Sequence, residues 1–155
     1  MDNSRQATLV LAEARGVRHV TYLSTYGSDQ APPEVDIRAV ELDLMSRQAF
    51  TSSVLHPAWV MQNFTDEHLP VIQDMITVPT AGGAEAFVDA ADIAAVAAET
   101  LADPDAHADA AYAIASGHGS RPNDDVRKVT GSPPASFADF GHSNAHAWAV
   151  PAAQS

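Results

Sequence analysis

Residues 18–25 read RHVTYLST, and this segment decides the fold. Its β-branched and aromatic residues, bounded by Gly27 and by Pro32-Pro33, are typical of a buried strand in a parallel sheet. Outward from it, residues 3–15 are predicted to form a helix, because apolar residues recur there at helical spacing and Gly16 stands where a helix ends. The strand is therefore expected to follow a helix directly.

A second helix and a second strand are predicted next. Residues 34–48 show helical spacing of apolar side chains, and residues 51–56, TSSVLH, form a strand-like run that ends at Pro57. This alternation of helices and strands predicts an α/β fold with right-handed crossovers between parallel strands. The apolar face of the second helix is expected to carry Val35, Ala39, Leu42 and Met45.

The rest of the chain is predicted to continue in the same style. A helix that ends at Leu101 is expected to begin at Asp89 or Asp92, because an aspartate side chain can accept hydrogen bonds from the first free amides of a helix. The last helix is expected to begin at Ser136 for the same reason. Further strands are predicted over residues 75–78, 86–88 and 110–115, and helical segments over residues 59–64, 67–74, 124–130 and 136–149.

Composition and charge exclude several classes of function. The chain has 155 residues, enough for one ordinary domain, and it contains no cysteine, which excludes thiolate metal sites and thiol nucleophiles. Its net charge is −12, and no Lys or Arg occurs between Gln48 and Ser120. Such a surface repels phosphate backbones and anionic lipid headgroups, and no apolar run is long enough to span a bilayer. We therefore expect no nucleic-acid partner, no membrane association and a cytoplasmic location.

Three segments resemble the NmrA-like family of atypical short-chain dehydrogenases, which bind NAD(P). They are residues 14–24, ARGVRHVTYLS; residues 54–64, VLHPAWVMQNF; and residues 86–96, AFVDAADIAAV. The second is similar to the family's LRPxxFMQN segment, with His56 where arginine is usual, and the third is similar to its FVDVxDIAAV segment. Because the segments occur in the family's order and spacing, the resemblance is expected to cover about residues 10–113.

The resemblance implies a partial Rossmann-like fold, a doubly wound parallel sheet that lacks the N-terminal half with the glycine loop and ends in a C-terminal helical segment. Residues 1–116 would be the C-terminal half of the NAD(P)-binding domain, and residues 117–155 a closing loop and helices. Family members hold the dinucleotide diphosphate on a GxxGxxG loop, and no glycine cluster here follows a first strand. We expect a chain shortened at its front and in its interior, by deletion, misassembly or gene decay; a deliberately compact relative is the alternative.

The resemblance also implies a site at the carboxyl ends of two predicted strands. Ser24 and Tyr26 are the candidate catalytic residues, because their hydroxyls can hold a substrate carbonyl; a strand-end cap and a packed aromatic ring are the alternative roles. Ile37 stands where relatives often place His or Lys, so the usual proton relay is not expected, and no metal site is expected either. The candidate cofactor-binding residues are Ser24, Thr25, Pro57, Ala58, Trp59, Gln62 and Asn63. The alternative is helix capping by Asn63 and core packing by Trp59 and Met61.

Three functions are compatible with these residues. The first is an NAD(P)H-dependent oxidoreductase of the NmrA type that reduces a small carbonyl, quinone or dye-like acceptor and is impaired by loss of the phosphate-binding loop. The second is a non-catalytic module that senses or regulates by binding a dinucleotide, and the third is a non-functional fragment. The resemblance implies NADP or NAD as the cofactor. Because a shortened parallel sheet leaves one strand edge unpaired, we also expect either a homodimer through that edge or a marginally stable monomer.

Overall fold

Parallel strands organise the molecule, for which the computed structural model describes residues 3–66, 68–69, 75, 85–114 and 123–148. A three-stranded sheet has the order β1-β2-β5, and a two-stranded sheet joins β3 to β4. Each of these pairs is parallel, which confirms the predicted α/β class with a parallel sheet. The strands are β1 (His19–Leu23), β2 (Thr51–Leu55), β3 (Trp59–Val60), β4 (Phe87–Val88) and β5 (Ala110–Tyr112).

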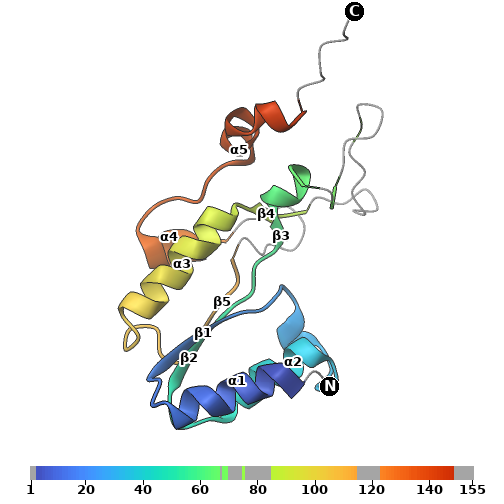
Figure 1. Ribbon diagram of the computed structural model, residues 1–155. Coiled ribbons are helices and arrows are strands. Elements are labelled where there is room, and N and C mark those ends of the chain that lie inside the picture. The colour runs from blue at the N-terminus through green and yellow to red at the C-terminus, as the bar shows by residue number, and fades with distance from the viewer. Residues whose placement is uncertain (1–2, 67, 70–74, 76–84, 115–122, 149–155) are drawn as a thin grey trace, which may run out of the picture.

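Helices cover both faces of the three-stranded sheet (Figure 1). The first two helices lie on one face and the third and fourth on the other, while the fifth lies beyond them near the β3–β4 pair. The helices are α1 (Asn3–Ala14), α2 (Asp36–Ser46), α3 (Ala90–Ala102), α4 (Asp125–Thr130) and α5 (Phe137–Ser143), with short 3-10 helices η1 (Ser28–Gln30), η2 (Met61–Phe64) and η3 (Ala145–Trp148).

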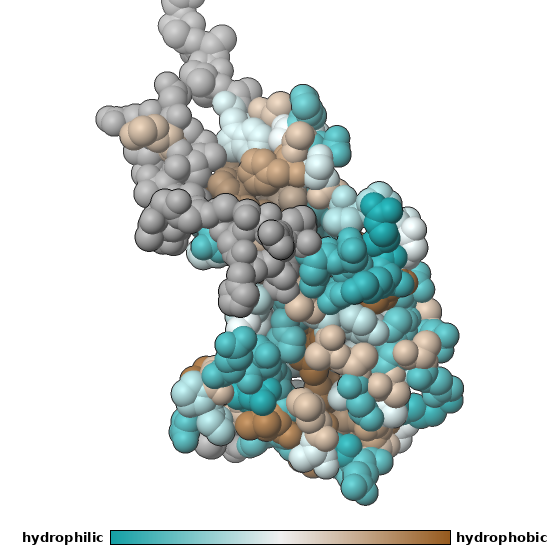
Figure 2. Space-filling view, turned by 180° about the vertical axis from the view of Figure 1, so that it is seen from behind, coloured by the Kyte–Doolittle hydropathy of each residue, from teal (hydrophilic) through white to brown (hydrophobic). Residues whose placement is uncertain are grey.

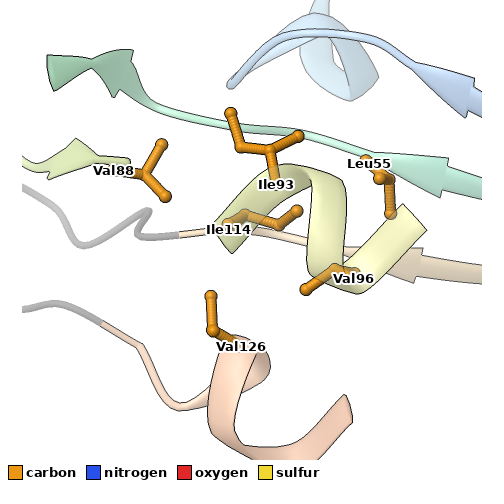
Figure 3. Packing of buried hydrophobic residues seen from close by; sticks show 6 residues of the cluster. All are labelled: Leu55, Val88, Ile93, Val96, Ile114 and Val126. Atoms are coloured by element: carbon orange, nitrogen blue, oxygen red, sulfur yellow. The ribbon is translucent and has the colours of Figure 1, made fainter. Parts of the chain in front are cut away.

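Neighbouring residues of β2 belong to different cores, because successive side chains of a strand point to opposite faces of a sheet. Val54 packs against α1 and α2, and Leu55 packs against α3. Figure 3 shows the second of these cores, in which side chains from β2, β4, α3 and α4 converge. The first core holds Leu9, Val40, Leu44, Phe50 and Val54, and the second holds Leu55, Val88, Ile93, Val96, Ile114 and Val126.

A third cluster of apolar residues joins the β3–β4 region to α5. Its buried members are Met61, Phe64, Leu69 and Phe140, and Phe87 and Trp148 pack against them. The Trp148 indole N–H donates a hydrogen bond to the Phe64 carbonyl, with 2.8 Å between the nitrogen and the oxygen. Figure 2 shows an apolar patch in the upper half of the molecule, where η2, β4 and α5 lie, and smaller apolar patches among the hydrophilic side chains of the lower half.

The capping predictions are confirmed. The Asp89 carboxylate accepts a hydrogen bond from the Ala91 amide at 2.8 Å and begins α3. The Ser136 hydroxyl oxygen accepts one from the Asp139 amide at 3.1 Å and begins α5. A side-chain acceptor at each helix start satisfies an amide that has no partner inside the helix.

Three predictions about helices are wrong. Residues 59–60, predicted as helical, form β3, because their backbone pairs with β4, and only residues 61–64 are helical. The last helix ends at Ser143 instead of continuing to residue 149, and a separate 3-10 helix follows it. The buried face of α2 is also shifted: its buried residues are Val40, Glu41 and Leu44, whereas Met45 is 63% exposed and Val35 42% exposed.

Several predictions fall outside the described residues. These are the strand over residues 75–78 apart from Met75, the helical segment over residues 67–74 apart from residues 68–69, and the boundary between residues 116 and 117. In the described part of the chain, no helix combines the length and apolar character needed to cross a membrane.

Candidate binding hollow at the carboxyl ends of the strands

A hollow of about 400 Å³ lies where β1 and β2 end. Its volume falls in the range of small-molecule pockets, and its lining combines apolar and polar side chains, as such pockets usually do. One wall is formed by the residues just after β1 and another by the residues just after β2. The lining residues are Thr25, Tyr26, Pro57, Ala58, Trp59, Val60, Asn63, Glu85 and Ala86.

Backbone hydrogen bonds carry the two walls beyond the ends of the strands. The Ser24 amide donates to the Leu55 carbonyl at 2.8 Å, and the Tyr26 amide donates to the Pro57 carbonyl at 3.0 Å. Gly27 then adopts a φ of 77°, a left-handed conformation that side chains disfavour, and the chain turns into η1. The walls therefore stay side by side for two residues past the sheet.

Most of the predicted site residues lie together in this hollow. Its polar groups include the Thr25 and Tyr26 hydroxyls and the Asn63 amide, which make no side-chain hydrogen bond within the described residues. Trp59 is 40% exposed, so part of its indole ring is open to solvent. The predicted residues that line the hollow are Thr25, Tyr26, Pro57, Ala58, Trp59 and Asn63.

Gln62 lies outside the lining of the hollow and has a structural role. Its amide nitrogen donates to Asp89 Oδ1 at 2.9 Å, and its amide oxygen accepts from the Ala90 backbone amide at 3.0 Å. Gln62 therefore fixes the start of α3 together with the Asp89 cap.

Ser24 is also absent from the lining, because its side chain is buried beneath the wall. Its hydroxyl donates to Glu41 Oε1 and lies 2.9 Å from the Ser28 hydroxyl. Ser24 is 7% exposed and Glu41 is 1% exposed. The structure thus separates the two candidate catalytic residues: the Tyr26 side chain borders the hollow, and the Ser24 side chain belongs to a buried polar cluster.

Glu41 is the centre of that cluster, to which α2, η1 and the ends of β1 and β2 contribute. The Ser28 hydroxyl lies 2.6 Å from Glu41 Oε1, and His56 Nε2 lies 3.0 Å from the same oxygen. Arg38 Nη1 donates to the other oxygen, Oε2, at 2.9 Å. Burial alone would raise the pKa of Glu41, but hydrogen bonds from Ser24, Ser28, Arg38 and His56 outweigh it and lower the pKa. Glu41 is therefore a buried carboxylate.

The charge around the hollow does not suit a diphosphate. No Lys, Arg or His is found among the described lining residues, and the one ionisable acid there is Glu85. Arg38, on the nearby α2, is already paired with Glu41. A dinucleotide diphosphate needs opposite charge or a row of free backbone amides. The hollow therefore fits an uncharged or cationic ring better than a phosphate group.

The described glycines do not supply a phosphate cradle either. Gly16, Gly27 and Gly131 have positive φ angles and serve as turns after α1, before η1 and after α4. Gly141 lies inside α5. Within the described residues, no glycine joins a strand to a full-length helix, which is the geometry that holds a diphosphate. Among the described residues, the lining of the hollow offers aromatic and uncharged polar groups and no group suited to a diphosphate.

Sequence reasoning missed two groups of residues at this site. Val60, Glu85 and Ala86 line the hollow because β3 and β4 pair beside it, and a two-residue strand leaves almost no periodic signal. Glu41 was missed because a charged residue in an amphipathic helix is ordinarily assigned to the solvent face. The available signal was its position next to Val40 and three residues before Leu44, in register with the buried face.

Comparisons with known proteins add no assignment. The chain matches no protein-family model, and a search of curated proteins finds none that is similar to it.

Proposed function

We propose that this chain is an NAD(P)H-dependent oxidoreductase-like protein of the NmrA type. In this proposal the hollow receives the nicotinamide ring or a small carbonyl, quinone or dye-like acceptor. The observation that carries it is the convergence of residues 25–26, 57–60 and 63 at the carboxyl ends of parallel strands. That edge of the sheet is where doubly wound folds bind their ligands.

A partial Rossmann-like fold is part of the same proposal. The parallel order β1-β2-β5 and the helices on both faces support it. β1 is an edge strand among the described residues, because it pairs with β2 alone. In a complete doubly wound sheet, further strands would continue beyond this edge.

Each free group of the hollow has a chemical use in binding a flat polar ligand. Trp59 offers an exposed aromatic face for stacking. The hydroxyls of Thr25 and Tyr26 and the amide of Asn63 can hydrogen-bond a carbonyl or a carboxamide. A carbonyl that is reduced also needs a proton at its oxygen, and the Tyr26 hydroxyl is the group in the hollow that can donate one.

A second candidate function is dinucleotide sensing without turnover, and one observation favours it. The Ser24 hydroxyl is committed to Glu41, and no basic side chain in the described lining can help Tyr26 release its proton. A site without a proton relay can bind a ring and still transfer hydride slowly or not at all. Binding and turnover must therefore be measured separately.

Binding can be measured by the fluorescence of Trp59, which lines the hollow, and turnover by the oxidation of NADPH. In a Trp148→Phe background, Trp59 is the remaining tryptophan, and circular dichroism checks that the variant is folded. We expect NADPH or a small quinone to quench Trp59 saturably, whereas the matched Trp59→Phe protein, which keeps Trp148, should show no saturable change. NADPH oxidation that depends on the quinone supports the reductase, and saturable quenching without oxidation supports the sensor. Absence of quenching at millimolar ligand would contradict both.

A further inference from the structure

We propose that Glu41 is a positioning residue that fixes the two walls of the hollow relative to each other. One wall contains residues 25–26 and the other contains residues 57–59. The role of Glu41 in ligand binding rests on the proposed function, since it assumes that the hollow is the binding site. The positioning itself is a property of the chain and can be tested without a ligand.

The first wall is attached to Glu41 on both sides. Ser24 precedes Thr25 and Tyr26, Ser28 follows them, and the hydroxyls of both serines contact Glu41 Oε1. The Ser28 hydroxyl also lies 2.7 Å from the Thr25 carbonyl oxygen, so it bridges the carboxylate and the wall itself. The turn that carries Tyr26 is therefore closed onto Glu41.

The second wall is attached to the same carboxylate oxygen. His56 Nε2 lies 3.0 Å from Glu41 Oε1, and Pro57, the next residue, is the first of the second wall. The backbone of His56 is held to the far strand of the sheet, since its amide donates to the Tyr112 carbonyl at 2.8 Å and its carbonyl accepts from the Ile114 amide at 3.1 Å. These two bonds fix the position of the His56 backbone against β5 and the residues that follow it.

One oxygen joins the two walls, and the other does not. Oε1 takes the serines and the histidine, whereas Oε2 takes Arg38, which belongs to the same helix as Glu41 and reaches neither wall. In the described residues, the walls have one other direct polar contact, the hydrogen bond from the Tyr26 backbone amide to the Pro57 carbonyl. Without Glu41, this hydrogen bond remains, but Ser24 and Ser28 are no longer connected to His56 through a shared carboxylate.

Because Glu41 and its donors are buried, their hydrogen bonds are difficult to replace. A carboxylate that is 1% exposed must keep its donors, because an unpaired charge in the interior is costly. Ser24, Ser28 and His56 are themselves buried, so water cannot readily replace the carboxylate if it is removed, although Ser28 keeps the Thr25 carbonyl as an acceptor. The geometry of the walls and the satisfaction of the buried groups therefore depend on the same atoms.

A matched pair of histidine variants tests the proposal in the Trp148→Phe background. His56→Leu cuts the second wall from Glu41, while His19→Leu removes a histidine of nearly equal burial, 9% against 8% exposed, at the opposite end of the sheet. We expect His56→Leu to increase acrylamide quenching of Trp59 and His19→Leu to leave it unchanged. His56→Gln, whose amide N–H can replace the imidazole donor, should restore the original quenching.

Ser28→Ala provides a second, milder variant if His56→Leu does not fold, and we expect it to increase the quenching as well. For a ligand that binds the parent, both variants should weaken affinity by roughly three- to tenfold, because a wall displaced by a fraction of an ångström misplaces the binding groups. If the parent binds neither NADPH nor quinone, the proposed function fails, while the quenching comparison still tests the positioning. Equal quenching in the His56 and His19 variants, or no increase in Ser28→Ala, would overturn the inference.

Discussion

The two ends of the three-stranded sheet each bury a histidine among hydroxyl groups, yet the two clusters differ in charge. At the amino end, His19 Nδ1 lies 2.8 Å from the Thr51 hydroxyl, and Nε2 lies 3.2 Å from the Ser53 hydroxyl. At the carboxyl end, His56 meets the carboxylate of Glu41. One histidine is embedded in neutral partners, and the other is part of an ionic cluster beside a hollow.

The hydrogen-bond directions at the amino end show why that cluster is self-contained. The Ser53 hydroxyl donates to the His107 carbonyl at 2.8 Å, so it accepts from His19 Nε2–H. The remaining ring nitrogen, Nδ1, lies 2.8 Å from the Thr51 hydroxyl, which is also 3.4 Å from the Arg18 carbonyl oxygen. These partners accommodate a neutral imidazole, and burial together with repulsion from His107 lowers the pKa of His19 despite an opposing contribution from Asp109. The cluster at the amino end therefore favours an uncharged histidine, whereas the cluster at the carboxyl end stabilises the charged carboxylate of Glu41.

The largest effect on the free energy of unfolding should come from removing the Glu41 carboxylate at the carboxyl end of the sheet. Glu41→Ala removes the shared acceptor of Ser24, Ser28 and His56 and leaves the Arg38 guanidinium without its partner; Ser28 keeps the Thr25 carbonyl as an acceptor. We expect the free energy of unfolding to fall by about 3–5 kcal/mol, the cost typical of breaking a buried ionic cluster by removing one partner. Urea denaturation followed by circular dichroism measures it. A loss below about 1 kcal/mol would show that the cluster is solvated.

The same cluster marks the limit of what the sequence predicts. Strong local signals placed β1, β2 and the caps of α3 and α5 correctly, because β-branched runs and side-chain caps act within a few residues. The buried face of α2 was predicted wrongly, since the pattern favoured Leu42 and Met45 over a stripe that contains Glu41. A buried charge is decided by partners on other elements, here the ends of β1 and β2, and no helical period records them.

A smaller loss is expected at the amino end. His19→Leu removes two hydrogen bonds, but Ser53 keeps the His107 carbonyl as its acceptor, and the Thr51 hydroxyl lies 3.4 Å from the Arg18 carbonyl. No buried polar group is left alone, so we expect a loss of about 1–2 kcal/mol in the free energy of unfolding. The measurement is the same urea titration as for Glu41→Ala. A loss as large as that of Glu41→Ala would remove the distinction between the two ends.

The two ends should also respond to acid in different pH ranges. The pKa of His19 is lowered in the folded state, so the unfolded chain takes up the proton first, and stability falls as the pH drops below about 6.5. The pKa of Glu41 is lowered as well, so its contribution is complete above about 4.5 and is lost as the pH falls through the folded value. Asp92 acts in the opposite direction, because burial raises its pKa, but it is common to all the variants.

Urea midpoints measured from pH 7.5 to 3.5 separate these contributions. His19→Leu should flatten the stability curve just below about pH 6.5, and Glu41→Gln should flatten it below about pH 4.5. The two variants thus serve as controls for each other. If Glu41→Gln changed the slope near pH 6 and His19→Leu did not, the assignment of the neutral end and the charged end would be reversed.

Most of the candidate site could be predicted because it depends on local order along the chain. Residues that follow a parallel strand arrive at its carboxyl edge, and this rule alone brings Tyr26 close to Trp59. The rule does not say which way a side chain turns. Ser24 turned to Glu41 and Gln62 to the start of α3 because buried polar groups must find partners, and those partners lie 17 and 27 residues away.

The smallest effect concerns the edge of β1, where the homodimer stays a prediction. An apolar hollow of about 390 Å³ lies between β1 and α3, and Leu23 at its rim is 56% exposed. If two copies pair through this edge, Leu23→Lys should weaken dimerisation by about tenfold, because a charged residue at a strand edge blocks pairing. Val10→Lys is the matched control, since Val10 is equally exposed but lies on α1. Sedimentation velocity at several protein concentrations distinguishes the variants. An equal change in the dimerisation of both variants, or a parent that is monomeric at every concentration, would show that the edge of β1 is not an interface. The hollow at the carboxyl ends of the strands would then be the remaining part of the sheet with a proposed binding role.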